Sequence, residues 1–518
     1  MNATDRAADA APRDAAGAGG EGRPGIGGAV SGRRPGADDG STAAGRADAA
    51  VADSVAPAIT ARADAIVASR LRSAAAREPL PGKATGSTAA ELAASLSAGS
   101  PHAARFAAEI AAAVRGTALA LQAAQPHPTD LWAAASAAHA DPSVWFEQAV
   151  LLGHPTHPLA RSRGELTDEE IHAYAPEHRA RFALGRYRLP PLTIWEGWGV
   201  ADGGVEFGLI PVHPWQAARR GLTGPERTWP DAAPLMSLRT ISTGDLHVKT
   251  AVDLQLTSAV RHVSLPAARN GRWVYERLAA PAAKLGITLM PERSALHRPL
   301  GEGYRWAPGS DFDTGLAAIV RPAPHTIGHP RAVPLAALAE PDPSSGRPIA
   351  AALAGDDLES WWEALAATLL DPLRLFADTG VALEAHGQNT LASFTGDRPA
   401  ALVYRDFGGI RVPPDDFPGV TGDLPEPDPE ARLTKLLAAL FPTTLTAIVD
   451  ALADWTGTDP GRWWSTVASA VRDLDLGDAI EGAVLRKPWP IKATTAMRLA
   501  DNPTADIWVH IDNPLAAA

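Results

Sequence analysis

The sequence predicts an α+β multidomain protein, with helices in its first and last parts and a strand-rich middle third. Its 518 residues are too many for one hydrophobic core, and 46% of them are hydrophobic, which is enough for several well-filled cores. Alanine-rich helical periodicity changes near residue 145 to proline, glycine and β-branched residues, and helical periodicity returns in the last third. We therefore expect domains over 56–144, 145–335 and 336–518.

Residues 1–55 are expected to form a disordered N-terminal extension. They are mostly Ala, Gly, Asp and Arg, with almost no large apolar side chain. Such a segment cannot bury enough surface to offset the entropy lost on ordering.

The predicted elements follow from local patterns. Apolar positions recur at three- and four-residue spacing over 59–124, as expected for helices. A hairpin is predicted from strands over 238–242 and 246–250 around a Thr-Gly-Asp turn. An amphipathic helix is expected over 357–377, ending before Gly380, and Asp459-Pro460 is typical of a helix start before 463–474.

Composition excludes several classes of function. The net charge of −12 leaves no basic stripe for nucleic acid, and the absence of cysteine removes thiolate nucleophiles, disulfides and Cys-ligated zinc or iron–sulfur sites. We find no uninterrupted apolar run of transmembrane length and no signal-peptide core. A cytoplasmic enzyme without a membrane or nucleic-acid partner is the expectation.

Two residues near a predicted strand carry the strongest chemical signal. Asn389 and Asp406 flank an apolar strand over 400–404, and the Asp is followed by Phe-Gly. Mg²⁺ takes only one or two oxygen ligands from protein when phosphates supply others, so this pair is suited to hold the ion against a nucleotide. Kinase-like folds use the same layout. The pattern therefore indicates a protein that uses ATP.

The loop before Asn389 argues against ordinary phosphoryl transfer to an alcohol. Such kinases need a loop carboxylate to accept the hydroxyl proton, whereas the side chain here is the amide of Gln388, which cannot act as a base. A small-molecule kinase using Asn389 and Asp406 stays as an alternative, weakened by the lack of a Gly-rich phosphate loop.

The predicted hairpin carries a second polar group. Ser237, Arg239 and Thr240 precede its turn, and Lys249 and Thr250 follow it. Alternation along a strand predicts Ser237 and Arg239 on one face. Arg offers a bidentate fork and Lys a point charge, so the group is suited to neutralise a triphosphate. A solvated strand face is the alternative.

Three further segments supply candidate anion ligands. Arg261 would extend the positive cluster toward a carboxylate substrate, and Lys492 would reach a substrate carboxylate unless it is a surface lysine. Two prolines keep His154 and His157 off a regular helix. We interpret their loop as a rigid one that aims imidazole and guanidinium donors at an anion. A zinc site and a turn with incidental histidines are the alternatives.

Taken together, these segments resemble the aerobactin-synthetase-like family, the siderophore synthetases that work independently of non-ribosomal peptide synthetases. The likeness spans about 145–515 and rests on the joint order of its motifs. They are Gly153–Pro158 with Arg163-Gly164, Tyr174–Glu177, Pro211–Gln216, Ser237–Thr240, Lys249-Thr250, Arg261, His386–Asn389, Arg405–Gly409, Lys492-Ala493 and Asn513–Leu515.

The resemblance implies a hand-like architecture, with a helical thumb, β-rich fingers and a largely helical palm around a central cleft. It implies that ATP and Mg²⁺ activate a carboxylate, commonly citrate, as an acyl-adenylate with release of pyrophosphate. An amine or alcohol then attacks the acyl carbon, giving an amide or ester and AMP. A homodimer is also implied.

The resemblance assigns roles by position. It implies catalytic residues at His157, Arg239, Lys249, Arg261 and His386. Cofactor-binding residues would be Ser237, Thr240, Thr250, Gln388, Asn389, Arg161 and Arg163. Magnesium ligands would be Asp406, Glu384 and Asn389, and substrate carboxylates would contact Arg261, His386 and Lys492. Fixed cations suit the charge that builds on the phosphates during adenylation, and a carboxylate nucleophile needs no base.

One position departs from the family pattern, because Arg161 stands where a lysine is usual. The charge survives, but the guanidinium is larger and planar, which alters a point contact to phosphate. The favoured hypothesis is a carboxylate-adenylating ligase. The kinase and a non-catalytic siderophore or citrate binder are the two others.

Overall fold

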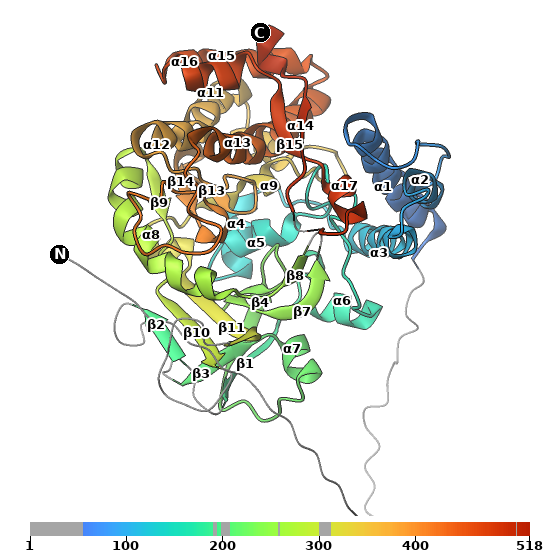
Figure 1. Cartoon of the computed structure of the whole chain (residues 1–518), viewed down its shortest axis with the longest axis vertical. Helices are drawn as coiled ribbons and strands as arrows, with labels where there is room; N and C mark the ends of the chain where they lie inside the picture. Colours follow the sequence, from blue (N-terminus) through green and yellow to red (C-terminus); the bar gives the residue numbers. More distant parts are fainter. Residues whose placement is uncertain are drawn as a thin grey trace, which may run out of the picture. The chain divides into compact units, whose positions relative to one another are not determined.

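The computed structural model describes residues 55–189, 194–197, 208–256, 259–299, 312–503 and 505–517. Val55–Ala518 forms one compact unit, and only this unit is described below. The predicted disordered extension, apart from its last residue, lies outside the described residues. Figure 1 shows mixed helices and sheets in this unit, as the sequence predicts.

Helices dominate the two ends of the described chain. The α-helices are α1 (Pro57–Arg77), α2 (Ala89–Leu96), α3 (Ala103–Gln122), α4 (Leu131–Ala138), α5 (Ser143–Ala149), α6 (Asp168–Tyr174), α7 (Pro214–Arg219), α8 (Leu265–Lys284), α9 (Leu335–Leu338), α10 (Ile349–Ala354), α11 (Leu358–Leu369), α12 (Asp371–Thr379), α13 (Pro429–Ala439), α14 (Thr446–Thr456), α15 (Pro460–Arg472), α16 (Asp478–Leu485) and α17 (Thr494–Leu499). Shorter turns are η1 (Pro176–His178), η2 (Pro324–Ile327), η3 (Phe407–Gly409), η4 (Leu440–Leu445) and η5 (Pro514–Ala517).

The largest sheet is antiparallel and comes from the middle of the chain. Its order is β2-β10-β11-β6-β5-β4-β1-β3. Its strands are β1 (Phe182–Arg188), β2 (Ile194–Gly197), β3 (Leu209–Val212), β4 (Arg227–Pro234), β5 (Thr240–Ser242), β6 (Leu246–Thr250), β10 (Ser294–Pro299) and β11 (Phe312–Pro322). Alternate residues such as Ile241 and Val248 build an apolar cluster on one face.

A second sheet joins strands from both sides of the predicted boundary at residue 335. Its order is β12-β13-β14-β9, and the β14–β9 pair is parallel. The strands are β9 (Ile287–Leu289), β12 (Ala332–Pro334), β13 (Thr390–Thr395) and β14 (Arg398–Tyr404). Two further pairs are β7 (Val252–Leu256) with β8 (Ala259–Arg261) and β15 (Trp489–Lys492) with β16 (Trp508–Ile511). The domain boundaries stay predictions.

The predicted hairpin is confirmed, but its first strand is shorter than expected. β5 and β6 pair with Thr240 opposite Lys249. Leu238 has a φ of 66°, a left-handed conformation that a strand does not adopt. Ser237 and Arg239 therefore lie in a tight turn, and the expectation that strand alternation puts them on one face is wrong.

The helix predicted over 357–377 is two helices, α11 and α12. Asp371 and Pro372 open α12, and proline in a helix interior would remove a hydrogen bond and clash with the preceding turn. Gly380 ends α12 with a φ of 67°, as predicted. The predicted start at Asp459-Pro460 is confirmed, because the Asp459 side chain accepts from Gly461 N at the start of α15.

One helical stretch qualifies the expectation that no run is long enough to span a membrane. Pro429–Thr456, which combines α13, the π-turn η4 and α14, is long and apolar enough for a span, and 72% of its most apolar window is buried inside the structure. Leu436, Phe441 and Ile448 lie in the main core. Such burial is typical of a core helix.

The first helices hold the short helix α17 from the far end of the chain. The Glu78 carboxylate accepts hydrogen bonds from Thr495 N and Ala496 N, at 2.8 and 2.9 Å. Arg498 pairs with Glu109, and Leu499 packs into the apolar cluster of α1–α3. Figure 1 shows α17, in red, against these blue helices.

Candidate active site

The centre of the candidate site is a partly buried ion pair between two predicted residues, Lys249 and Asp406, whose side chains are 7% and 23% exposed. Lys249 Nζ, on β6, lies 2.7 and 2.5 Å from the two carboxylate oxygens of Asp406, which precedes η3. Asp406 has a φ of 72°, uncommon for a residue other than glycine. Burial alone would raise the pKa of Asp406, but Lys249 and Arg321 hold it far below its usual range. The carboxylate is therefore ionised at neutral pH.

Cations outnumber carboxylates around this pair. Burial and the neighbouring guanidinium of Arg261 lower the pKa of Arg239 to about 10. Burial also lowers the pKa of Arg261, against the nearby carboxylates of Glu384 and Asp406. Arg321, only 2% exposed, lies close enough to Asp406 and Glu292 for both to affect its pKa, which burial lowers. Crowded buried cations of this kind fit a polyanionic ligand.

Sequence reasoning missed Glu292 and Arg321, which complete the buried charge network. Glu292 Oε1 lies 3.9 Å from an Arg321 nitrogen. Burial and the charge of Asp406 raise the pKa of Glu292 to about 7, against the effect of Arg321. Neither residue stands in a motif with a recognisable spacing, and both come to the site only through the pairing of β11 with β6 and the packing after β9.

The loop that carries His386, Gln388 and Asn389 is fixed from behind by Arg405. The Arg405 guanidinium donates to the carbonyl of Gln388 at 2.8 and 3.1 Å, and its backbone N donates to the Asn389 carbonyl at 3.0 Å. The same guanidinium pairs with Glu147 of α5. Arg405 is 4% exposed and acts as a scaffold for the loop, a role that its place before Asp406 did not reveal.

Glu384 lies beside the turn that carries Asp406. A Cβ added to Gly409 would stand 1.8 Å from Glu384 Oε2, so only glycine leaves room for this carboxylate. His386 Nε2 lies 3.8 Å from the same oxygen. The structure thus brings Glu384, His386 and Asp406 together. The charges of Glu384 and Asp406 both raise the pKa of Arg261 against the effect of its burial.

His157 joins this group as a neutral imidazole. Burial, together with nearby positive groups that include Arg70 and Arg261, lowers its pKa well below the usual value. Its Nδ1 accepts from Leu159 N at 3.0 Å, so Nε2 carries the proton. The predicted loop geometry therefore presents a neutral donor rather than a cation.

Two predicted hydroxyl ligands help to shape the turn beside Lys249. Ser237 Oγ accepts from Thr240 N at 3.1 Å, and Thr250 Oγ1 donates to the Arg239 carbonyl at 2.8 Å. The Arg239 guanidinium donates to the carbonyl of His262 at 2.7 Å. These bonds hold Arg239 and Lys249 side by side.

The structure gives Arg161 and Arg163 a different environment from the one expected. Both guanidinium groups pair with the buried Glu177 carboxylate, and Arg161 also donates to the carbonyls of Leu151 and Val150. The two arginines are 2% and 5% exposed. Their donors are engaged inside the protein, so we revise their expected role from cofactor contact to support of the loop that carries His157.

Lys492 lies in a separate group of charges. Its Nζ is 2.8 Å from Asp506 Oδ1, and Lys435 Nζ is 2.9 Å from the other oxygen of that carboxylate. The side chain of Lys492 is 33% exposed, so it is neither buried nor a fully solvated lysine.

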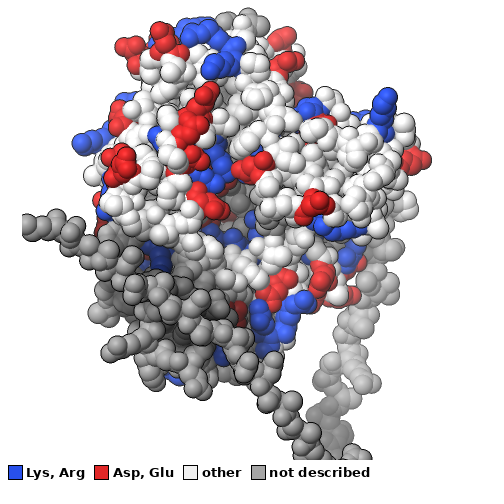
Figure 2. Space-filling model, viewed as in Figure 1, with Lys and Arg blue, Asp and Glu red and all other residues white. Residues whose placement is uncertain are grey.

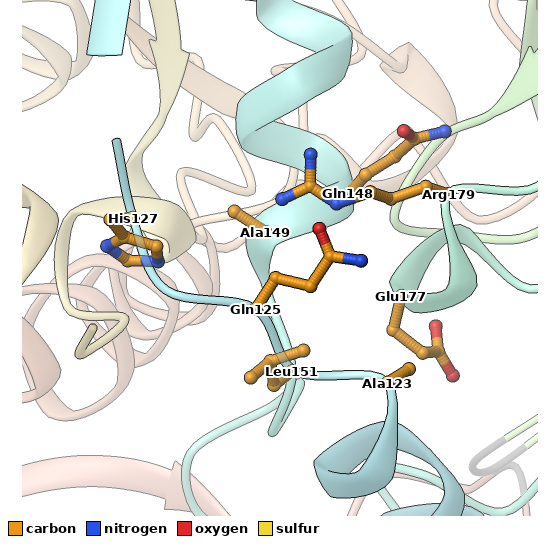
Figure 3. A pocket seen from close by; sticks show the side chains of 8 residues that line it. All are labelled: Ala123, Gln125, His127, Gln148, Ala149, Leu151, Glu177 and Arg179. Carbon is orange, nitrogen blue, oxygen red and sulfur yellow. The ribbon is translucent and has the colours of Figure 1, made fainter. Parts of the chain in front are cut away.

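Figure 2 shows Lys and Arg side chains in a recess near the middle of one face, with Asp and Glu side chains at its rim. Figure 3 shows a small cavity lined in part by Gln148, Glu177 and Arg179. That cavity is about 10 Å³, which is room for no more than one water. It is too small for an organic ligand and lies by the support cluster of Glu177.

Among the described residues, no group of three or more His, Cys, Asp or Glu side chains could hold a metal ion by itself. A Mg²⁺ ion shared with nucleotide phosphates needs only one or two carboxylates from protein. Asp406 and Glu384, on either side of η3, fit that smaller requirement.

Two family descriptions match different parts of the chain. The IucA / IucC family matches residues 143–191 and 203–340. The family described as ferric iron reductase FhuF-like transporter matches residues 359–507. The chain has no cysteine, so a Cys-ligated iron–sulfur centre has no ligands in it.

Curated relatives include two synthetases of Staphylococcus aureus. Staphyloferrin A synthase is 28% identical over 52% of this chain and 53% of the relative. L-2,3-diaminopropanoate–citrate ligase is 29% identical over 52% of this chain and 54% of the relative. The chain thus aligns with about half the length of these relatives.

The solved structures include ATP-bound aerobactin synthetase IucA from a hypervirulent pathotype of Klebsiella pneumoniae. It matches with a TM-score of 0.65 and 20% identity, over 80% of this chain and 83% of that one. Petrobactin biosynthesis protein AsbB from Bacillus anthracis matches with a TM-score of 0.64, 18% identity and coverage of 80% and 79%. These likenesses show the fold.

Proposed function

Because the chain belongs to the IucA/IucC family of siderophore synthetases, we propose that it is an ATP-dependent ligase. It would join a carboxylate, with citrate favoured, to an amine or an alcohol, and release AMP and pyrophosphate. One observation carries this proposal beyond the family. Buried cations around Asp406 exceed the carboxylates there, while the neighbouring loop has Gln388 where a kinase needs a base.

The residues around Asp406 fit a nucleotide triphosphate. Lys249 and Arg321 lie on the adjacent strands β6 and β11, and Arg239 lies in the turn before β5. Two Arg321 nitrogens have no hydrogen-bond partner within the protein. Phosphate oxygens would supply those acceptors. Asp406 and Glu384 would hold magnesium, which would neutralise charge on the phosphates. In the structure Lys249 holds Asp406, so we expect Lys249 to turn to a phosphate when ATP binds.

The first half-reaction needs charge stabilisation rather than a base. A carboxylate oxygen of the acid would attack the α-phosphorus, forming a new P–O bond as the bond to pyrophosphate breaks. The acid is already ionised at neutral pH, so no proton has to leave. Arg239, Lys249 and the neutral donor His157 would meet the charge that develops on the departing oxygens.

The second half-reaction would take place at the other end of the group. The amine or alcohol would attack the acyl carbon, a C–N or C–O bond would form, AMP would leave and the nucleophile would lose one proton. Arg261 and His386 lie on the Glu384 side of η3, and we assign them to the carboxylates of the acid. Their fixed positions would align the acyl carbon.

The relatives support citrate as the acid and an amine as the nucleophile. One is described as a citrate ligase for diaminopropanoate and others as citryl-hydroxylysine synthases. No comparison supports the kinase alternative. The thumb, fingers and palm interpretation, the homodimer and the cytoplasmic location stay predictions.

The test is product analysis with ATP, Mg²⁺ and citrate, using hydroxylamine as the nucleophile. We expect AMP, pyrophosphate and a hydroxamate, all dependent on citrate. Formation of ADP in place of AMP would support the kinase alternative. AMP with other carboxylates but not with citrate would keep the ligase and change the acid. If citrate binds but neither citrate nor any of a panel of other carboxylates supports turnover of ATP, the non-catalytic binder is supported.

A further inference from the structure

Two lysines share one carboxylate in the group of charges that is separate from the Asp406 cluster. Lys435 of α13 and Lys492 at the end of β15 lie 2.9 and 2.8 Å from the two oxygens of Asp506. Both ammonium groups also lie near the Trp508 ring, 6.0 and 5.6 Å from its centroid. The side chains of Lys435 and Asp506 are 15% and 27% exposed, so the group is recessed but open.

The group carries more positive charge than Asp506 can neutralise. Burial lowers the pKa of Lys435, and the charges of Lys492 and Arg411 lower it further, which places Arg411 close by. Burial would raise the pKa of Asp506, but the two lysines hold it below its usual value. Two lysines therefore share one ionised carboxylate, and the charge of a third cation, Arg411, acts on Lys435. Such an imbalance in a recess fits an anionic ligand rather than an ammonium group.

Arg411 links this group to the turn that bears the catalytic carboxylates. Its guanidinium donates to the carbonyls of Gly409 and Ile410, at 3.3 and 2.9 Å. Gly409 is the residue against which the Glu384 carboxylate lies. Arg411 thus contacts the same short stretch of chain beside which the Glu384 carboxylate lies.

We propose that Lys435, Lys492 and Arg411 form a second carboxylate subsite, which Asp506 occupies internally until a substrate carboxylate displaces it. The inference rests on the proposed ligase function. The carboxylate would belong either to the acid, at an end remote from the acyl carbon, or to an amino-acid nucleophile. Trp508 would cover the apolar part of the same ligand.

The displaced carboxylate gives the proposal an unusual signature. If Asp506 competes with the ligand, Asp506→Asn must tighten binding, because the lysines keep their charge and lose their internal partner. If Asp506 instead binds a substrate ammonium, or has only a structural role, the same substitution must weaken binding or leave it unchanged.

The experiment is calorimetric titration of the full chain with α,β-methylene-ATP present. The probes are citrate, 2,3-diaminopropanoate and ethylenediamine. Ethylenediamine is 2,3-diaminopropanoate without its carboxylate. Lys435→Ala is expected to weaken binding of the carboxylate probe that uses the subsite by roughly ten-fold, as for loss of a charged hydrogen bond. Asp506→Asn is expected to tighten it by about three-fold or more. Lys435→Arg should stay near the parent.

Lys487→Ala is the matched control, since Lys487 also faces α13, near Glu430, but is 66% exposed. It should change nothing. If Lys435→Ala changes the affinity for citrate, the acid is the source of the carboxylate. If it changes the affinity for 2,3-diaminopropanoate but not for ethylenediamine, the nucleophile is the source.

Unchanged affinity of Lys435→Ala for both carboxylate probes would overturn the subsite, as would weaker binding by Asp506→Asn or no binding of either probe to the parent chain. A different result would reject the proposed function but keep the subsite. In that result the parent chain binds a carboxylate probe, Lys435→Ala weakens and Asp506→Asn tightens this binding, and no carboxylate gives AMP.

Discussion

Two carboxylates, Glu177 and Asp406, both lie among cations, but Glu177 is buried at 2% exposure whereas the side chain of Asp406 is 23% exposed. Each lies in a motif that the sequence analysis singled out, and each has two or more cations around it. Around Glu177 the cations are Arg161 and Arg163, and the other Arg161 donors form hydrogen bonds with backbone carbonyls. Around Asp406, by contrast, two nitrogens of the buried Arg321 have no hydrogen-bond partner in the protein. We infer that donors left without an acceptor, rather than burial, motif or surplus charge, distinguish the site that we assign to a ligand from the structural one.

The largest effect is expected at the structural carboxylate. Glu177→Gln leaves two buried arginines without their counter-charge and should reduce the free energy of unfolding by about 3–5 kcal/mol at pH 7. Chemical denaturation measures this loss. The KM for ATP of the folded fraction should not change, and a selective rise in that KM would contradict the comparison.

The same variant has a defined pH dependence. Burial would raise the pKa of Glu177, but Arg163 and Arg161 hold it at about 2 in the folded protein, below the value of about 4.3 in an unfolded chain. A depressed folded pKa contributes stability above the unfolded value and loses it as pH falls toward the folded one. The stability difference between parent and Glu177→Gln should therefore shrink between about pH 4.3 and 2.

The next largest effect is expected at the functional carboxylate. Asp406→Asn keeps a side chain that tolerates positive φ but removes the charge that pairs with Lys249 and that we assign to magnesium. AMP formation should fall by about 100-fold or more, while stability falls less than in Glu177→Gln, because the Asp406 side chain is 23% exposed and solvent screens the lost charge. Radiolabelled pyrophosphate exchange measures the first half-reaction. Retention of magnesium-dependent exchange would remove Asp406 from the metal site.

Arg261→Ala should separate the two ends of the site. Its neighbours are Glu384 and Asp406, yet we assign it to the acid, so the KM for citrate should rise about ten-fold or more and the KM for ATP should stay within about two-fold. Steady-state kinetics with each substrate varied in turn gives both values. Equal rises in the two would move Arg261 into the phosphate group.

Arg161→Lys should give the smallest effect. A lysine cannot satisfy Glu177 and two carbonyls at once, so stability should fall by about 1 kcal/mol for a lost hydrogen bond. The KM for ATP should not move. A ten-fold rise in that KM with unchanged stability would restore the sequence-based expectation that Arg161 contacts phosphate.

Features with a local cause could be predicted from sequence. The turn between β5 and β6, the Asp459 cap and the strand before Asp406 depend on neighbouring residues, and the structure has all three. The break between α11 and α12 was also local, but the continuous apolar stripe across it concealed Pro372. The left-handed turn at Leu238 had no signal, since leucine rarely adopts that conformation.

The partners of the site residues could not be predicted. Glu147 reaches the site from α5, Glu292 from the loop that follows β9, and Arg321 from strand β11. Ion pairing between residues far apart in the sequence produces no periodic pattern from which it could be predicted. Likewise, nothing in the order of Arg161 and Arg163 shows that their charge is consumed by Glu177. A resemblance assigns positions, whereas the balance of charge at each position is a property of the folded chain.

The clasp between Glu78 and α17 sets the order in which this protein can mature on the ribosome. The two backbone amides that Glu78 binds lie 417 and 418 residues after it. At a synthesis rate of about 5–20 residues per second, α1–α3 wait roughly 20–80 s for that partner. The buried carboxylate of Glu78 has to stay hydrated in the meantime. The segment that follows Lys492 can therefore dock only after residues 494–499 have left the ribosome, and nascent chains stalled before residue 495 should expose the first three helices to proteases.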